Sequence, residues 1–97
     1  MDRYKLKKIS EISKNDKRIA LIGKVVEINE NSFWLDDGSG KKEIILEGEI
    51  EKGSFVRVFC SVIGEKLKAD ILQKINEKDF YLFEKFNELY RRVEEYV

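Results

Sequence analysis

Apolar and polar residues alternate along most of the middle of the chain, in runs that turn-forming residues separate. Alternation of this kind is typical of strands with one buried face. The runs predict five strands, over residues 18–28, 32–37, 41–47, 54–63 and 66–75. Strands of this length, joined by short turns, favour an all-β domain in which a five-stranded antiparallel sheet closes into a barrel.

The alternation also predicts which side chains fill the barrel, because neighbouring strand residues point to opposite faces. In the second strand, Phe33 and Leu35 are expected inside and Trp34 outside. The first strand carries Gly23 at its centre, which predicts a bend or a bulge there. Further residues expected on the outside are Lys24, Ile45, Phe55, Arg57 and Phe59.

Apolar residues near the end of the chain recur with a different period from those of the strands. Asn76 is a good N-cap, and Asp79 follows it as a variant of the capping box. Apolar residues then recur at helical spacing, which predicts an amphipathic helix over residues 76–97, after a barrel domain at residues 1–75. The apolar face of this helix comprises Leu82, Phe83, Phe86, Leu89, Tyr90, Val93, Tyr96 and Val97.

That apolar face has two interpretations. It can complete the core of a single subunit, or it can also pack against helices of other subunits in an oligomer. The width of the face favours the second interpretation. At the other end of the chain, residues 1–17 are highly charged, with Leu6, Ile9 and Ile12 evenly spaced. We expect a lead-in segment there that rests on the barrel and contains a short helical turn.

The composition narrows the possible functions. The chain has 97 residues, sufficient for one small domain, and contains no histidine. Because histidine is the most common general base and metal ligand, we expect no enzyme activity, no metal and no cofactor. Asp36 and Asp37 are the remaining candidates for a hydrolase, but adjacent strand residues point to opposite faces. Cys60, the single cysteine, is expected to be a small core residue.

The charges cancel over the chain but not along it. Nineteen basic and nineteen acidic residues argue against a strong, non-specific polyanion binder. Residues 1–24, however, hold eight Lys and Arg against three Asp and Glu, which leaves a local basic strip. No run is apolar enough for a membrane span, and the N-terminus lacks the apolar core of a signal peptide. We therefore expect a cytoplasmic, intracellular protein.

The order of the strand motifs resembles a known family. The segments IGKVVEI, FWLDDGSGKKEIIL, GSFVRVFCSV and LKADIL follow one another as in the OB-fold proteins that bind single-stranded DNA. In that family, an acidic, glycine-containing turn joins the second and third strands, a glycine opens the fourth, and a small residue follows within it. The corresponding residues here are Asp36, Asp37, Gly38, Gly40, Gly53 and Cys60. With its final helix, the chain looks like the middle and small subunits of replication protein A and their archaeal and telomere-capping relatives.

This resemblance implies a non-catalytic subunit that binds single-stranded DNA or RNA and joins other OB-fold subunits through its C-terminal helix. Such barrels bind strands on the outer face of the second and third strands, where aromatic rings stack on bases and lysines follow the phosphates. The candidate nucleic-acid-binding residues are Trp34, Lys24, Lys41, Lys42, Arg57, Phe55 and Phe59. The apolar face of the helix supplies the candidate partner-binding residues.

These candidates also have structural interpretations. Trp34 can cover the barrel wall or contact the N-terminal segment, and the lysine pair after the turn can keep that turn hydrated. Phe55 and Phe59 can lie under the C-terminal helix. The alternative function is accordingly a protein-interaction scaffold that does not contact nucleic acid. The absence of net charge supports it, as does Glu47, where related DNA-binding barrels often carry an aromatic residue.

Overall fold

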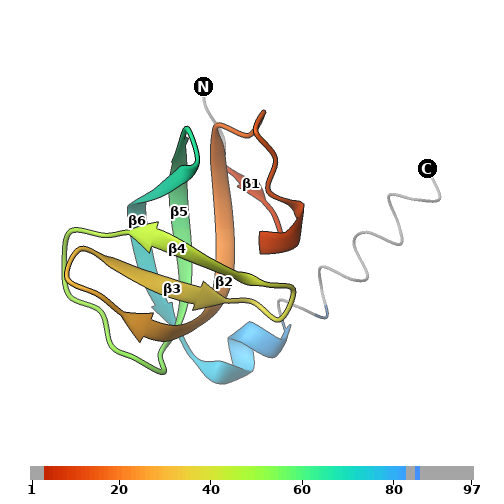
Figure 1. Cartoon of the computed structure of the whole chain (residues 1–97). Helices are drawn as coiled ribbons and strands as arrows, with labels where there is room; N and C mark the ends of the chain where they lie inside the picture. The colour runs from red at the N-terminus through yellow and green to blue at the C-terminus, as the bar shows by residue number, and fades with distance from the viewer. Residues whose placement is uncertain (1–3, 83–84, 86–97) are drawn as a thin grey trace.

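The predicted strands are present in the computed structural model, which describes residues 4–82 and residue 85 (Figure 1). Each begins and ends within two residues of its predicted bounds. A two-residue strand, which is too short to show a period, and a 3₁₀ helix precede them. The elements are β1 (Lys5–Leu6), η1 (Ile9–Glu11), β2 (Arg18–Ile28), β3 (Ser32–Asp36), β4 (Lys41–Ile45), β5 (Phe55–Ile63) and β6 (Lys66–Ile75).

Five of the strands form a closed ring. Hydrogen-bonded neighbours follow the order β2-β3-β4-β6-β5, and β5 pairs with β2 to complete the circle. In Figure 1, β3 and β4 cross in front of the long strands β2, β5 and β6. This order is that of the OB fold, a small Greek-key barrel, so the expected fold is confirmed.

One pairing in the ring is parallel, a detail that the expected antiparallel barrel did not include. β4 runs in the same direction as β6, with Ile44 opposite Leu67. In a closed ring with an odd number of strands, directions cannot alternate all the way around, so one neighbouring pair must be parallel. Outside the ring, β1 adds a second parallel pairing, to β2.

Alternate side chains from all five strands fill the interior, as the sequence pattern predicts. Phe33, Leu35 and Ile44 have no exposed surface, and Val58 and Cys60 are equally buried. The burial of Cys60 raises the pKa of its thiol to about 12, so the thiol stays protonated. The inside and outside assignments of the predicted strands are confirmed here.

The long strand β2 contains a bulge, which lies just after Gly23 rather than at it. Its register against β3 shifts between Val25 and Glu27, which marks a β-bulge. β2 pairs with β5 from Arg18 to Lys24 and with β3 from Lys24 onward, so the strand passes from one wall to the next. A Cβ at Gly23 would lie only 2.6 Å from the carbonyl oxygen of Asp36. Glycine is therefore needed there for β3 to approach.

The N-terminal segment rests on the barrel through η1, as expected, but Leu6 does not take part, because it is 42% exposed. Ile9 and Ile12 pack against the core. The buried carboxylate of Asp37 accepts a hydrogen bond from the backbone N–H of Ile9, with 2.7 Å between Oδ2 and N. Ser39 Oγ accepts a second from the N–H of Ser10, at 3.1 Å. The turn between β3 and β4 thus fastens η1 onto the barrel.

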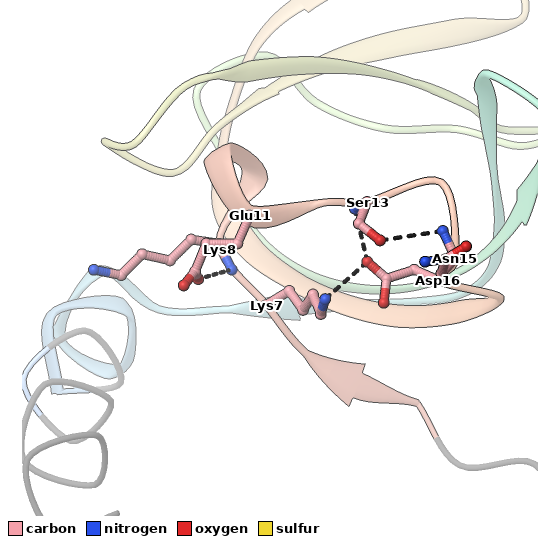
Figure 2. Close-up of polar contacts among 6 residues, drawn as sticks. All are labelled: Lys7, Lys8, Glu11, Ser13, Asn15 and Asp16. Carbon is pink, nitrogen blue, oxygen red and sulfur yellow. Dashed lines mark hydrogen bonds and ion pairs between the residues drawn. The ribbon is translucent and has the colours of Figure 1, made fainter. Parts of the chain in front are cut away.

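A second set of polar contacts fixes the loop between η1 and β2 (Figure 2). Lys7 Nζ lies 2.9 Å from Asp16 Oδ2, and the same oxygen accepts a hydrogen bond from the N–H of Ser13 at 2.8 Å. The hydrogen bond from Lys7, followed by that from Ser13, lowers the pKa of the Asp16 carboxyl. Asn15 donates its N–H to Ser13 Oγ, which closes the loop.

A helix follows β6 over residues 77–82 and begins with the predicted cap. The N–H of Asp79 donates to Asn76 Oδ1 at 2.8 Å. Phe80 is buried, whereas the side chain of Leu82 is 64% exposed. The other predicted partner-binding residues, Phe83, Phe86, Leu89, Tyr90, Val93, Tyr96 and Val97, lie outside the described residues. Their role in assembly, and a helix reaching residue 97, remain predictions.

In the part of the chain that the structure describes, no helix is both long and apolar enough to cross a membrane. Among the same residues, no cluster of three or more His, Cys, Asp or Glu side chains is arranged to hold a metal ion.

Candidate nucleic-acid interface

Trp34 lies on the outer face of β3. Its sequence neighbours Phe33 and Leu35 are fully buried, whereas Trp34 itself is partly exposed. Glu27 of β2 and Glu43 of β4 lie directly opposite it. Because opposite residues of an antiparallel pair share a face, the indole ring stands between these two side chains on the outside of the barrel.

Trp34 lines a groove of about 540 Å³. The groove is formed by the turn before β3, by β3 and β4, by the start of β6 and by the turn between β5 and β6, and no residue of the segment 4–17 takes part. Its lining residues are Asn31, Ser32, Trp34, Lys41, Lys42, Glu43, Ile45, Glu65, Lys66 and Leu67. One large aromatic ring thus lies among three lysines and two glutamates. Proteins that bind single strands combine the same features, because bases stack on aromatic rings while phosphates follow cations.

The three lysines come from two strands that are distant in sequence. Lys41 begins β4 opposite Asp36, and Lys66 begins β6. Lys42 donates a hydrogen bond from Nζ to the carbonyl oxygen of Glu65, at 3.4 Å. This contact links β4 to the turn between β5 and β6 and holds a cation at the edge of the groove.

Glu43 is held in place on the same face. Its Oε2 accepts hydrogen bonds from Ser32 Oγ at 2.8 Å and from Asn29 Nδ2 at 3.3 Å. Its Oε1 accepts none from the described residues. The groove therefore contains an oriented carboxylate next to the aromatic ring, with one oxygen available to a ligand.

The other four candidate residues lie on the outer face of β2 and β5. They point outward as predicted, but they do not line the groove: Lys24, Arg57, Phe55 and Phe59. Phe55 packs against Phe80 at the start of the helix, with ring centroids 4.9 Å apart. Phe59 meets the edge of Tyr4, at 5.1 Å. These rings are therefore engaged with the segments that flank the barrel.

Two cations of this wall lie over its aromatic rings. Lys24 Nζ is 5.9 Å from the ring centroid of Phe55, and the guanidinium of Arg57 is 5.8 Å from that of Phe59. Arg57 Nε also donates to Gln73 at 2.9 Å. Cations held over aromatic rings stabilise the wall. The structure thus brings Trp34, Lys41 and Lys42 together and separates them from these four.

Sequence reasoning did not single out Lys66, Glu65 or Glu43. The first two reach the groove only because β4 pairs with β6, a contact between residues far apart in the chain. The sequence did offer one signal for Glu65 and Lys66, which is that they follow the fourth strand directly. The turn between the fourth and fifth strands borders the binding face of OB folds. Glu43 follows the lysine pair directly, and its alternation with Ile44 places it outside.

Asp36 and Asp37 both hold the turn. Asp37 Oδ1 accepts from the N–H and the hydroxyl of Ser39, at 2.9 and 2.6 Å, while its Oδ2 binds the N-terminal segment. Asp36 Oδ1 accepts from the N–H of Gly38, at 2.9 Å. The acidic turn is thus a structural device.

A second groove, of about 630 Å³, lies beside the loop 46–54 and has the opposite charge. Among the described residues that line it, Lys74 is the one cation, and it forms an ion pair with Glu51 at 3.1 Å. The apolar side chains of this acidic groove are Ile28, Leu46, Ile50, Val56 and Leu72, and its acidic ones are Glu30, Glu49 and Glu51. Carboxylates repel phosphates, so the groove beside Trp34 is the better candidate for nucleic acid.

Comparison with known proteins shows the fold. No protein-family model and no curated protein sequence matches the chain. Among solved structures, the telomere capping protein Ten1 from Saccharomyces pombe superposes with a TM-score of 0.77 at 12% identity, covering 93% of this chain and 99% of Ten1. A chain of the S. pombe Stn1–Ten1 complex gives 0.76 at 13% identity, covering 94% of each chain. U. maydis replication protein A bound to single-stranded DNA gives 0.57 at 20%, covering 74% of this chain and 73% of that one. These likenesses agree with the OB fold that the strand order defines.

Proposed function

We propose that this chain is a non-catalytic OB-fold subunit that binds single-stranded nucleic acid, DNA in the first place, in the groove beside Trp34. In the same proposal, its C-terminal helix joins it to other OB-fold subunits in a complex like replication protein A. The groove carries the proposal, because it combines one aromatic platform with Lys41, Lys42 and Lys66. The solved neighbours support it: one is bound to single-stranded DNA, and another belongs to a two-protein complex.

The expected affinity of the isolated subunit is low. Stacking on one aromatic ring contributes about 1–3 kcal/mol per base. Three lysines offer few phosphate contacts, which supply most of the affinity of strong binders. A second binding module on a partner subunit would raise the effective concentration of the strand, so weak contacts in this groove still contribute.

The experiment uses Trp34 as its own probe, since the chain has one tryptophan. A mixed-sequence single strand of about 12 nucleotides is titrated at low salt while the fluorescence is followed. We expect saturable quenching that weakens as salt is added, and weaker binding in the Lys41→Ala and Lys66→Ala variants. Lys74→Ala, in the acidic groove, is the matched control and should bind like the parent. Fluorescence that stays constant up to high micromolar DNA would contradict autonomous binding.

The acidic groove favours a second candidate function, that of a protein-interaction scaffold. Its apolar floor and surrounding carboxylates, Glu30 and Glu49 among them, fit a partner segment in which lysine or arginine flanks an apolar side chain. Under this function no strand binds in the titration above. Glu30→Lys and Glu49→Lys would then be the variants expected to abolish partner binding.

A further inference from the structure

The groove beside Trp34 contains a feature that phosphate binding does not explain. Glu43 lies directly opposite Trp34, on the same outer face, and both residues line the groove. The Cβ atoms of such a pair are about 5 Å apart. A carboxylate in this position repels phosphates, so any part that it plays in binding concerns another group of the ligand.

The carboxylate is also oriented. Ser32 Oγ and Asn29 Nδ2 both donate to Oε2 of Glu43, at 2.8 and 3.3 Å. Since both donors bind the same oxygen, Oε1 is left to accept from a ligand. The residue is exposed and lies in β4, so the carboxylate is fixed by its neighbours and by the strand rather than by burial.

We propose that Glu43 reads the edge of the base stacked on Trp34 and selects bases that carry an exocyclic amino group, cytosine over uracil or thymine. This inference rests on the proposed function. An ionised carboxylate only accepts hydrogen bonds. The 4-amino group of cytosine donates to it, a pairing known from DNA readout, whereas the 4-carbonyl oxygen of uracil or thymine places two acceptors against each other. The lysines hold the phosphates whichever base is present.

The test compares oligodeoxycytidine with oligodeoxyuridine of about 12 nucleotides at neutral pH and low salt, by quenching of Trp34 fluorescence. The two bases differ only at position 4 of the ring and its neighbouring nitrogen, so stacking and phosphate contacts are matched. We expect cytidine strands to bind about tenfold more tightly, which is the effect of one charge-assisted base contact. In Glu43→Gln, whose amide both donates and accepts, the preference should fall below about twofold.

Two further variants separate base reading from general charge. Glu65→Gln removes a carboxylate from the same groove that has no hydrogen bond to a described side chain. This variant should bind both strands more tightly, by the same factor, and should keep the preference for cytidine. Ser32→Ala removes one donor that orients Glu43 and should reduce the preference while uridine strands bind as before.

Each outcome has a separate meaning. Equal binding of the two strands overturns this inference and leaves the proposed function intact. A cytidine preference that persists in Glu43→Gln overturns the assignment to this residue. If neither strand quenches Trp34, the proposed function itself fails, and the inference fails with it.

Discussion

At the scale of single residues, Asp37 shows how one side chain connects a turn to the rest of the fold. It is buried, and its two oxygens accept hydrogen bonds from Ile9 on one side and from Ser39 on the other. A buried donor that loses its acceptor keeps its full desolvation cost. Asp37 therefore matters for stability well beyond the turn in which it lies.

We expect Asp37→Ala to lower the free energy of unfolding by about 2–3 kcal/mol, because the N–H of Ile9 would be buried without an acceptor. Urea unfolding followed by circular dichroism measures this loss. The adjacent Asp36→Ala removes only an exposed local bond to Gly38 and should cost less than about 1 kcal/mol. Equal losses in the two variants would show that Asp37 does not fasten the N-terminal segment.

At the scale of elements, the segments outside the ring depend on polar contacts at their ends. The N-terminal segment is secured by the Asp37 turn and by the contacts of Asp16 with Lys7 and Ser13 (Figure 2). Within the ring, β2 depends on a backbone feature, the close approach of Gly23 to Asp36. Such features connect elements that hydrophobic patterning alone would leave loosely placed.

The Asp16 contacts predict a pH dependence of stability. Because Lys7 and Ser13 lower the pKa of Asp16 below its ordinary 3.8, the folded state is stabilised above that pH. This stabilisation is lost as the pH falls through the lowered pKa of the folded state. We expect Asp16→Asn to cost about 1 kcal/mol at neutral pH and to differ little from the parent in strong acid.

Urea unfolding at several pH values measures the Asp16 effect. Glu30→Gln is the control, because Glu30 is exposed and forms no hydrogen bond or ion pair with the described residues. Its difference from the parent should be small at every pH. A cost of Asp16→Asn that persists undiminished in acid would mean that the side chain acts through packing rather than through its charge.

At the scale of the whole molecule, a chain without net charge carries two grooves of opposite character. The groove beside Trp34 has three lysines against two glutamates, and the acidic groove has three glutamates against one lysine. Net charge therefore says little about whether this protein can bind a polyanion. The distribution of charge over the surface decides it.

This distribution predicts a shallow salt dependence of strand binding. Each phosphate contact to a single strand contributes about −0.7 to the slope of the logarithm of affinity against the logarithm of salt concentration. With three lysines in the groove, we expect a slope of about −2. Lys66→Ala should bring it to about −1.4, whereas Lys74→Ala should leave it unchanged. A slope near zero would contradict phosphate binding in this groove.

The sequence by itself determined the five ring strands, their inward and outward side chains, the bulge in β2 and the cap at Asn76. These are properties of local order: each follows from a period, a glycine or a capping side chain within a few residues. The same local signals identified Trp34 and the lysine pair after the turn as candidate binding residues. They could not say which outward residues face the same ligand.

Only the tertiary structure decided that question, because the outside of a closed barrel has several sides. The pairing of β4 with β6 brought Lys66 to Trp34 across a long stretch of chain, and the pairing of β2 with β5 carried Phe55 and Arg57 to another wall. The strand β1 and its parallel pairing likewise depend on a contact with β2. Strand alternation fixes the radial direction of a side chain, but its position around the barrel is set by which strands close the ring.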